Sequence, residues 1–170
     1  MSAQAFFSIV GKDLLAFATN RVFLCVLISW FVAQFLKLFT SSKYRKDGVS
    51  IWKFLIGSGG MPSSHSSAVC AACFSCGILE GFGSPIFAVS AVLAAVVMRD
   101  AAGIRREAGK QAEAINAVTE ELSKKHKRLA DYTLSELLGH TPLQVFCGAL
   151  LGFILAFVCQ GWLFQLWFKA

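Results

Sequence analysis

The sequence predicts an all-α integral membrane protein, a polytopic bundle of about four transmembrane helices with a cytoplasmic amphipathic helical connector. Two observations lead to this prediction. Hydrophobic residues make up 56% of the 170 positions and charged residues only 15%, so a soluble domain of this size could not cover its apolar surface. Apolar segments long enough to cross a hydrocarbon core of about 30 Å also recur along the chain.

We interpret residues 1–170 as a single membrane domain. Its four predicted spans are residues 22–39, 62–79, 85–99 and 142–168. The predicted connector covers residues 101–139. Asn20 can cap the first span, and Lys37 near its end can extend its ammonium group to the membrane surface. The segment 51–56 is too short to cross and is predicted to lie at the membrane interface.

Prolines mark the starts of the later spans. Pro62 suits the first residue of the second span, and Ser84 and Thr141 can cap the third and fourth ahead of a proline. Apolar residues of the connector recur at helical spacing: Ile104, Ala108, Ile115, Val118 and Leu122. This spacing predicts an amphipathic helix that extends beyond the membrane, and Thr133 with Glu136 predicts a second, short helix.

The N-terminal segment is weakly apolar and is interrupted by Lys12 and Asp13. It has no apolar core followed by a small-residue cleavage site, so it does not resemble a secretory signal peptide. The sequence leaves open whether residues 5–18 enter the membrane.

Basic residues predict the orientation of the chain. Four lie between the first two spans and seven in the connector: Lys43, Arg45, Lys46 and Lys53, then Arg105, Arg106, Lys110, Lys124, Lys125, Lys127 and Arg128. The turn between the second and third spans contains none. The positive-inside rule therefore places both basic regions in the cytoplasm and both termini on the other side.

The six cysteines all lie in apolar segments: Cys25, Cys70, Cys73, Cys76, Cys147 and Cys159. Cys70, Cys73 and Cys76 share one face of a helix, which is compatible with a metal or redox site or with packing of small residues between helices. We favour packing, because a zinc site needs a fourth ligand and a polar setting. No disulfide framework is expected.

Three polar clusters lie at span ends, and antiparallel threading brings all three to the cytoplasmic face. The first runs from Gly57 to His65 and opens the second span. Glycines such as Gly60 let backbone amides approach a ligand, and the N–H groups of a helix start favour an anion, phosphate above all. Ser63 and Ser64 add hydroxyl groups. A flexible connector with an ordinary helix start is the other interpretation.

The second cluster closes the third span and includes the carboxylate of Asp100. Arg106 and Lys110 are four residues apart and share a helix face beside Arg105, and guanidinium groups suit phosphate oxygens. Anchoring to anionic lipid headgroups is the alternative for these cations, and it is the preferred interpretation for residues 124–128.

The third cluster centres on His140, directly before the fourth span. A nearby helix N-terminus disfavours imidazolium, and a neutral imidazole can act as a nucleophile or general base. Of His65 and His140, one could attack phosphorus while the other protonates the leaving oxygen, and the cations would hold the remaining oxygens. Neither histidine belongs to an H-x-x-x-H or carboxylate-rich set, so no metal ion and no other cofactor is expected.

Three segments give the chain a family resemblance: GGMPSSHSSAV, MRDAAGIRREAGKQAEAIN and ELLGHTPLQVFCGALLG. They resemble the characteristic segments of the divergent PAP2 family, also called acid phosphatase/vanadium-dependent haloperoxidase-related membrane proteins. The resemblance covers about Asn20 to Phe157, most of the chain.

Members of the wider PAP2 group are phosphatases that form a phosphohistidine without a metal ion. The segment from Pro62 to His65 resembles their P-S-G-H motif, which implies that His65 is the general acid and that Ser63 and Ser64 contact phosphate. His140 resembles the histidine of their last motif, which implies that it is the nucleophile.

The chain departs from this pattern in several places. Gln144 replaces an aspartate that orients the nucleophile; an amide can accept a hydrogen bond from imidazole but cannot stabilise imidazolium by charge. Leu134 stands where the last motif of the wider PAP2 group has an arginine. The cations of the second cluster, Lys37 or Arg45 could supply that missing charge. The first motif of the wider PAP2 group, a lysine followed by Arg-Pro, has no clean match in this sequence. Members of that group have six spans and this chain has four predicted spans, so a homodimer could complete the bundle.

We therefore expect a metal-independent phosphatase that acts on a membrane lipid phosphate at the cytoplasmic face through a phosphohistidine. Phosphatidate, phosphatidylglycerophosphate and polyprenyl phosphates or diphosphates are equally compatible substrates. The alternatives are a non-catalytic binder or carrier of anionic lipid and, less favoured, a haloperoxidase-like enzyme that holds vanadate. Membrane lipids are the expected partners and nucleic acid is not, and the lack of a transit peptide favours a bacterial inner (cytoplasmic) membrane.

Overall fold

Helices form all the regular structure in residues 3–40, 60–123 and 139–167, the part of the chain that the computed structural model describes. In chain order the elements are α1 Ala3–Ala18, α2 Arg21–Thr40, α5 Ser64–Glu80, α6 Pro85–Arg99, η1 Asp100–Ile104, α7 Arg105–Ser123, α8 Pro142–Val158, η3 Cys159–Leu163 and α9 Phe164–Trp167. The segments η1 and η3 are single π-helical turns. The prediction of an all-α fold is confirmed.

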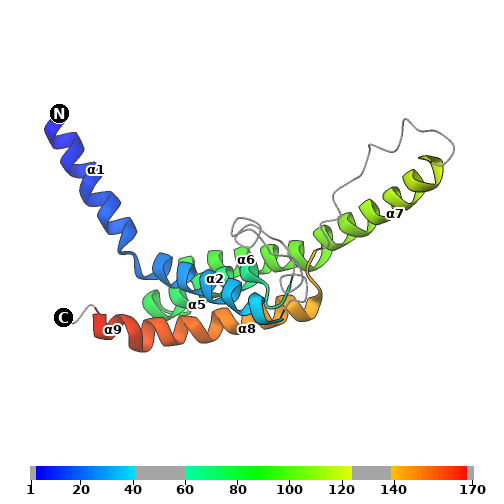
Figure 1. The fold of residues 1–170 in the computed structure, drawn as a ribbon. Helices are drawn as coiled ribbons and strands as arrows, with labels where there is room; N and C mark the ends of the chain where they lie inside the picture. The colour runs from blue at the N-terminus through cyan, green and yellow to red at the C-terminus, as the bar shows by residue number, and fades with distance from the viewer. Residues whose placement is uncertain (1–2, 41–59, 124–138, 168–170) are drawn as a thin grey trace.

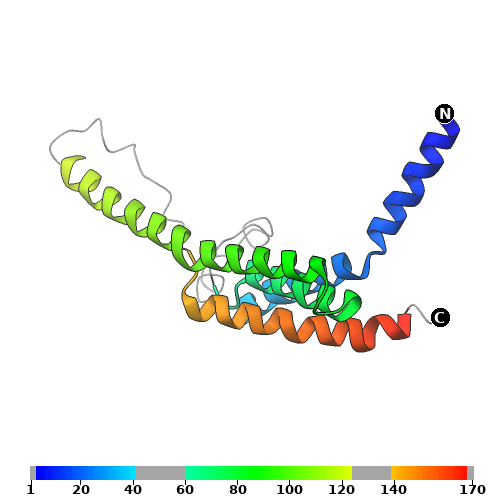
Figure 2. The ribbon, with the colours of Figure 1, turned by 180° about the vertical axis from the view of Figure 1, so that it is seen from behind.

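The helices α2, α5, α6 and α8 form an elongated bundle, and α1 and α7 project from its opposite ends (Figure 1). The N-terminal segment therefore forms a helix that leaves the bundle. Seen from behind, α6 runs through η1 into α7 as one rod that lies along α8 and then passes beyond it (Figure 2). The amphipathic helix predicted in the connector is confirmed as far as Ser123, while Thr133, Glu136 and the segment 51–56 lie outside the described residues.

Among the described residues, three helices are long and apolar enough to cross a membrane: Arg21–Thr40, Pro85–Leu122 and Pro142–Leu166. The remaining predicted span, α5, has 17 residues, fewer than the roughly 20 that usually cross a hydrocarbon core. The helix begins at Ser64, two residues after the predicted start at Pro62, and ends at Glu80. Ser63 is the N-cap, and its Oγ accepts the N–H of Ser66 at 3.4 Å. The helix nevertheless lies at the centre of the bundle and contacts α2, α6 and α8.

Two of the predicted helix caps are formed by side-chain oxygens. Asn20 Oδ1 accepts the N–H groups of Val22 and Phe23, both at 3.0 Å, at the start of α2. Ser84 Oγ accepts the N–H of Phe87 at 3.3 Å at the start of α6, where Pro85 occupies the first helical position. These bonds satisfy amides that have no partner within the helix. The predictions for Asn20 and Ser84 are confirmed.

Small and polar side chains fill the interior of the bundle, and large apolar side chains cover its outside. The buried residues include Ser29, Ala33, Ser67, Ala71 and Ser75. The exposed ones include Phe31, Phe35, Val89, Val92, Phe146 and Ile154. This distribution reverses that of a soluble protein, and a bilayer is the solvent that suits it. The six cysteines are free thiols, and Cys25, Cys70, Cys73 and Cys159 are buried among these small residues.

Two glycines bring the backbones of α5 and α8 into contact. A Cβ atom on Gly148 would clash with the carbonyl oxygen of Ser63, and one on Gly152 would clash with that of Ser67. The two glycines are one turn apart, the spacing that lets membrane helices pack closely. On its other side, Ser67 is bound to α2, because its Oγ lies 2.6 Å from Ser29 Oγ. The start of α5 is therefore held firmly between α8 and α2.

Candidate functional site

The N-terminus of α5 is buried at one end of the bundle. Ser63 is fully buried and Ser64 is 2% exposed, and Ser63 Oγ also accepts a hydrogen bond from Ser66 at 3.1 Å. Gly60 precedes them with a φ of 81°, a left-handed conformation that glycine adopts without strain. Thr40 at the end of α2 donates to the carbonyl of Met61 and so ties this segment to α2. The result is a buried helix start lined by hydroxyl groups, a setting that suits an anion.

Lys37 reaches this helix start from α2. Its side chain is 1% exposed, and its Nζ donates a hydrogen bond to Ser64 Oγ at 3.1 Å. Within the described part of the chain Lys37 forms no ion pair with a carboxylate. An ammonium group has three donors, so two N–H groups have no acceptor among the described residues and can serve a ligand. Because a buried cation inside a membrane bundle is costly, it marks a functional site by default.

Lys37 therefore does not extend to the membrane surface, one of the two roles that the sequence allowed for it. Its position suits the other role, in which it supplies the charge of the arginine that Leu134 replaces. Ser29, Ala33 and Lys37 follow one another at intervals of four residues, and all three are buried. This face of α2 packs against α5, so Lys37 turns inward to the hydroxyl of Ser64. The sequence contains a pattern that indicates this inward orientation. Ser29 and Ala33 are small residues at helical spacing, which is typical of a packing face, and Lys37 lies on the same face.

The start of α8 holds His140 in a defined orientation. The ring Nδ1 of His140 lies 3.2 Å from Gln144 Oε1, and the same oxygen accepts the N–H of Thr141 at 3.0 Å. The N–H of Gln144 donates to Thr141 Oγ1 at 3.3 Å, which completes a capping box and confirms the predicted cap at Thr141. Because Gln144 Oε1 is an acceptor, a neutral His140 ring bonded to it carries its proton on Nδ1. The lone pair then lies on Nε2, the atom that can act as a nucleophile.

Backbone hydrogen bonds connect His140 to the other two clusters. The N–H of His140 donates to the carbonyl of Ala101 in η1 at 3.0 Å. The N–H of Ser63 donates to the carbonyl of Gln144 at 3.0 Å. His140 itself is 5% exposed. The three predicted clusters therefore meet at one end of the bundle, as antiparallel threading required.

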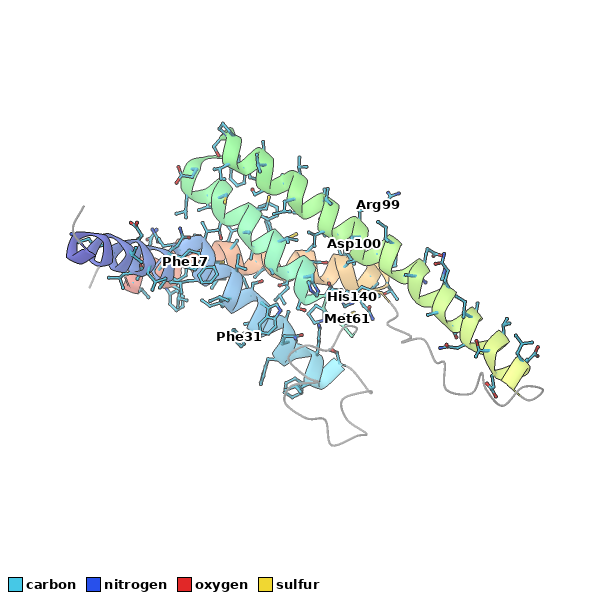
Figure 3. The ribbon with its side chains drawn as sticks, turned by 90° about the horizontal axis from the view of Figure 1, so that it is seen from above. Phe17, Phe31, Met61, Arg99, Asp100 and His140 are labelled. Carbon is cyan, nitrogen blue, oxygen red and sulfur yellow. The ribbon has the colours of Figure 1, made fainter. Side chains whose placement is uncertain are left out.

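The view from above places this meeting point in the fold. Met61, Asp100 and His140 gather at one end of the bundle, whereas Phe17 lies toward the other end (Figure 3). Asp100 is half-buried in the π-helical turn η1. Single π-helical turns within helices occur frequently at functional sites. Arg99, one residue earlier, points away from the bundle (Figure 3).

His65 differs from its neighbours. It is exposed, although Ser63, Ser64 and Ser66 around it are buried. It therefore lies on the outer side of the first turn of α5, while the serines face the bundle interior. A ligand that reached both His65 and His140 would lie at the end of the bundle and not deep within it.

The cations predicted to bind phosphate lie along the first turns of α7. Arg106 is half-buried, and Lys110 is exposed and forms a 2.8 Å ion pair with Glu107. For Arg105 the structure gives the position on the helix but not the side chain. The structure thus connects His140, Gln144, Ser63, Ser64 and Lys37 through α2, α5 and α8, and leaves the roles of the α7 cations as predictions.

No group of three His, Cys, Asp or Glu side chains that could hold a metal ion occurs within residues 3–40, 60–123 and 139–167. The chemistry that these residues offer is that of an imidazole, hydroxyl groups, an ammonium group and helix-start amides. Together they can bind an anion and present a nucleophilic nitrogen to it.

This fold and this site define an integral membrane helix bundle with a histidine-containing, anion-suited site at one end. The chain belongs to the divergent PAP2 family, whose sequence profile matches residues 18–155. It is also similar to YuiD, an uncharacterized membrane protein of Bacillus subtilis (strain 168), with 40% identity over 117 residues that make up 63% of this chain and 74% of YuiD. No solved structure matches the chain at a significant level. The family resemblance noted from the sequence is confirmed.

Proposed function

We propose that this protein is a metal-independent phosphatase that hydrolyses a membrane lipid phosphate through a phosphohistidine intermediate. The observation that carries the proposal is the buried hydrogen bond between Lys37 and Ser64. It places a cation with two remaining donors at a helix start, beside the segment that contains Ser63 and contacts α8. A phosphate group would supply the negative charge that the described surroundings of Lys37 lack. Membership of the divergent PAP2 family agrees with phosphate chemistry.

In the proposed first step, Nε2 of His140 attacks phosphorus, a P–N bond forms, and the bond between phosphorus and the lipid oxygen breaks. His65 donates a proton to that leaving oxygen, so a lipid alcohol departs. In the second step, water attacks phosphorus and gives a proton to His65 as the P–N bond breaks. Inorganic phosphate leaves, and both histidines return to their starting states.

The other residues bind and orient in this proposal. Lys37, Ser63, Ser64 and the amides that follow Gly60 hold the non-bridging oxygens. The cations Arg105, Arg106 and Lys110 add positive potential at the membrane surface where a headgroup lies. Gln144 is a positioning residue that keeps the His140 proton on Nδ1, and Asp100 supports the same end of the bundle through η1.

The proposed location is the cytoplasmic leaflet of a bacterial cytoplasmic membrane. The site lies at the bundle end that adjoins both basic connectors, and the positive-inside rule assigns such connectors to the cytoplasm. The occurrence of a relative in Bacillus subtilis supports a bacterial setting.

The test is release of inorganic phosphate by the purified protein, in detergent with EDTA, from phosphatidate, phosphatidylglycerophosphate and polyprenyl phosphates. We expect phosphate release to persist in EDTA and to be abolished by His140→Ala. The matched control is His126→Ala, which replaces the third histidine of the chain and should keep the wild-type rate. Brief incubation should also give an acid-labile, alkali-stable phosphoprotein. Equal release by His140→Ala and wild type would rule out this mechanism.

A second candidate is a non-catalytic binder or carrier of anionic lipid. The observation that favours it is Gln144, because its neutral amide cannot stabilise by charge the positive imidazole ring that forms when His140 attacks phosphorus. This candidate predicts binding of phosphatidate vesicles by wild-type protein, weakened by Lys37→Met, without release of phosphate from any of the lipids.

A further inference from the structure

The helix α7, together with Ile104 at the end of η1, carries an apolar stripe that no described helix covers. Ile104, Ile115, Val118 and Leu122 are 70%, 50%, 58% and 46% exposed. The rod Pro85–Leu122 has 38 residues, which is about 57 Å at 1.5 Å per residue, against a hydrocarbon core of about 30 Å. The distal part of α7 therefore lies outside the hydrocarbon, and no described helix lies beside it (Figures 1 and 2). Such a stripe needs an occupant that is not lipid tails.

The spacing of the stripe indicates what kind of occupant fits. Its six members are all exposed and are separated alternately by four and three residues: Ile104, Ala108, Gln111, Ile115, Val118 and Leu122. This is the a/d pattern of a two-stranded coiled coil. Ala112, Ala114 and Thr119 lie directly beside the middle of the stripe and are small neutral residues that allow another helix to approach closely. The charged flanking residues Arg105, Glu107 and Glu121 lie at its two ends.

The charges on α7 favour a second copy over the membrane surface. The helix contains three basic and four acidic residues, and the acidic ones Glu113, Glu120 and Glu121 occupy its distal half. Helices that lie on membranes carry mainly Lys and Arg on the polar face, whereas α7 has no basic residue from Gln111 to Ser123. This part of α7 therefore favours contact with another helix, and the headgroup anchoring predicted for residues 124–128 begins only after it. In a parallel pair, Lys110, Glu113 and Glu120 fall at outward positions. Glu107 and Glu121 flank the stripe at g positions, which face e positions of the second copy and not one another, and Glu107 faces the neutral Ala112.

A second copy in the same membrane presents the same stripe, on the same side and at the same height. Two such stripes are self-complementary around a two-fold axis. Confinement to one membrane also raises the effective concentration of the two helices, which offsets the limited stability of a coiled coil this short.

We infer that α7 is a dimerisation arm, in which the six-residue stripe packs against that of a second copy as a parallel coiled coil outside the hydrocarbon. This inference does not depend on the proposed function. It also gives the predicted homodimer a defined contact surface.

The first test is site-specific crosslinking of the full chain in vesicles. Val118→Cys places a thiol within the stripe, and Glu120→Cys places one on the opposite face. Under mild oxidation we expect a covalent dimer for Val118→Cys and the low background of wild type, with its six native cysteines, for Glu120→Cys. Equal crosslinking at the two positions, or none at Val118→Cys, would overturn the inference.

The second test is the molar mass of the protein in mild detergent, measured by light scattering. Wild type and the matched Glu113→Lys/Glu120→Lys variant should be dimers, and Ile115→Glu/Val118→Glu should be a monomer of unchanged helix content. A dimer that survives Ile115→Glu/Val118→Glu would show that another surface pairs. A monomeric wild type would also reject the inference. Protection of Val118→Cys from a water-soluble maleimide would then identify the chain's own connector as the occupant, and protection only on vesicles would identify the membrane.

Discussion

Lys37 Nζ and Ser64 Oγ lie 3.1 Å apart, and both side chains are at least 98% buried. The bond joins two helices through residues 27 positions apart in the chain. Burying an ammonium group is tolerated only where hydrogen bonds or a counter-ion compensate for the lost hydration. The single described bond to a neutral hydroxyl is incomplete compensation, and this is why the bundle end is suited to an anionic ligand.

Lys37→Met removes this charge and keeps the length of the side chain. We expect release of phosphate to fall by about 100-fold or more, because one preorganised donor to a developing charge is typically worth that much. Folding should be little affected, since replacing a buried charge with an apolar side chain is often neutral. Initial rates together with thermal unfolding in detergent check both expectations.

The matched control is Lys12→Met, because Lys12 is exposed on α1, which leaves the bundle. It should leave both rate and unfolding temperature unchanged. If Lys37→Met releases phosphate within twofold of wild type, Lys37 has no part in phosphate binding.

His65→Ala should affect substrates according to their leaving groups. A general acid matters when the leaving oxygen is strongly basic, as in a lipid alcohol, and matters little for a phenolate. We expect His65→Ala to slow hydrolysis of a lipid phosphate by about 100-fold or more and that of p-nitrophenyl phosphate by less than about tenfold. His140→Ala should abolish both activities. Equal losses for both substrates in His65→Ala would contradict a role as the acid.

Gln144 can be varied in two opposite directions. Gln144→Glu keeps an acceptor for His140 and for the N–H of Thr141, and adds a charge that stabilises imidazolium and suits a helix N-terminus. Gln144→Leu loses both bonds. We expect release of phosphate by Gln144→Glu at or above the wild-type rate, and a fall of about 100-fold for Gln144→Leu.

A simple structural role of Gln144 would have a different signature. Loss of the capping bonds alone costs about 0.5–2 kcal/mol and lowers the unfolding temperature without changing the pH dependence of the rate. Since Gln144 is proposed to hold the ring proton of His140, the pH profile of kcat should shift in Gln144→Glu. An unshifted profile would indicate a cap and nothing more.

Glycine substitutions test the contact between α5 and α8. In Gly148→Ala and Gly152→Ala the new methyl group would clash with the carbonyl oxygens of Ser63 and Ser67. Each variant should lose about 1–3 kcal/mol of stability, because backbone atoms cannot move aside as a flexible side chain can. Gly148→Ala should also lose more activity than Gly152→Ala, since Ser63 lies at the proposed site.

Gly11→Ala is the control for these variants. Gly11 lies in α1 with nothing within 4 Å of an added Cβ, and alanine is the better helix former. Unfolding followed by circular dichroism should show it at least as stable as wild type. Unchanged stability of Gly152→Ala would mean that the two helices can separate without cost.

Much of the fold follows from the sequence because span length and caps are local properties. Asn20, Ser84 and Thr141 cap the helices for which they were predicted, and the periodicity of the connector predicts α7. Antiparallel threading alone brings Asp100 and His140 to one end. The predicted start of α5 at Pro62 was wrong. Proline often occupies the first helical turn, but here the next residue, Ser63, is the cap and the helix begins after it.

The sequence left two orientations open for Lys37, toward the headgroups or toward the site, and did not decide between them. A lysine near a span end usually extends to the headgroups, and only the partner helix decides whether it turns inward. The bond from Ser63 to Gln144 was likewise unpredictable, since it depends on how closely the glycines of α8 let two backbones approach. Properties that require two helices at once are not readable from either helix alone.

The packing of α8 against α5 also bears on biosynthesis. Helices enter the membrane in the order of translation, so α2, α5 and α6 are in place before α8 emerges from the ribosome. His140 directly precedes α8, so it joins the proposed anion site only when Gly148 and Gly152 of α8 pack against α5. The last helix to insert therefore completes the proposed site, and a chain that stalls before α8 reaches the membrane remains without it.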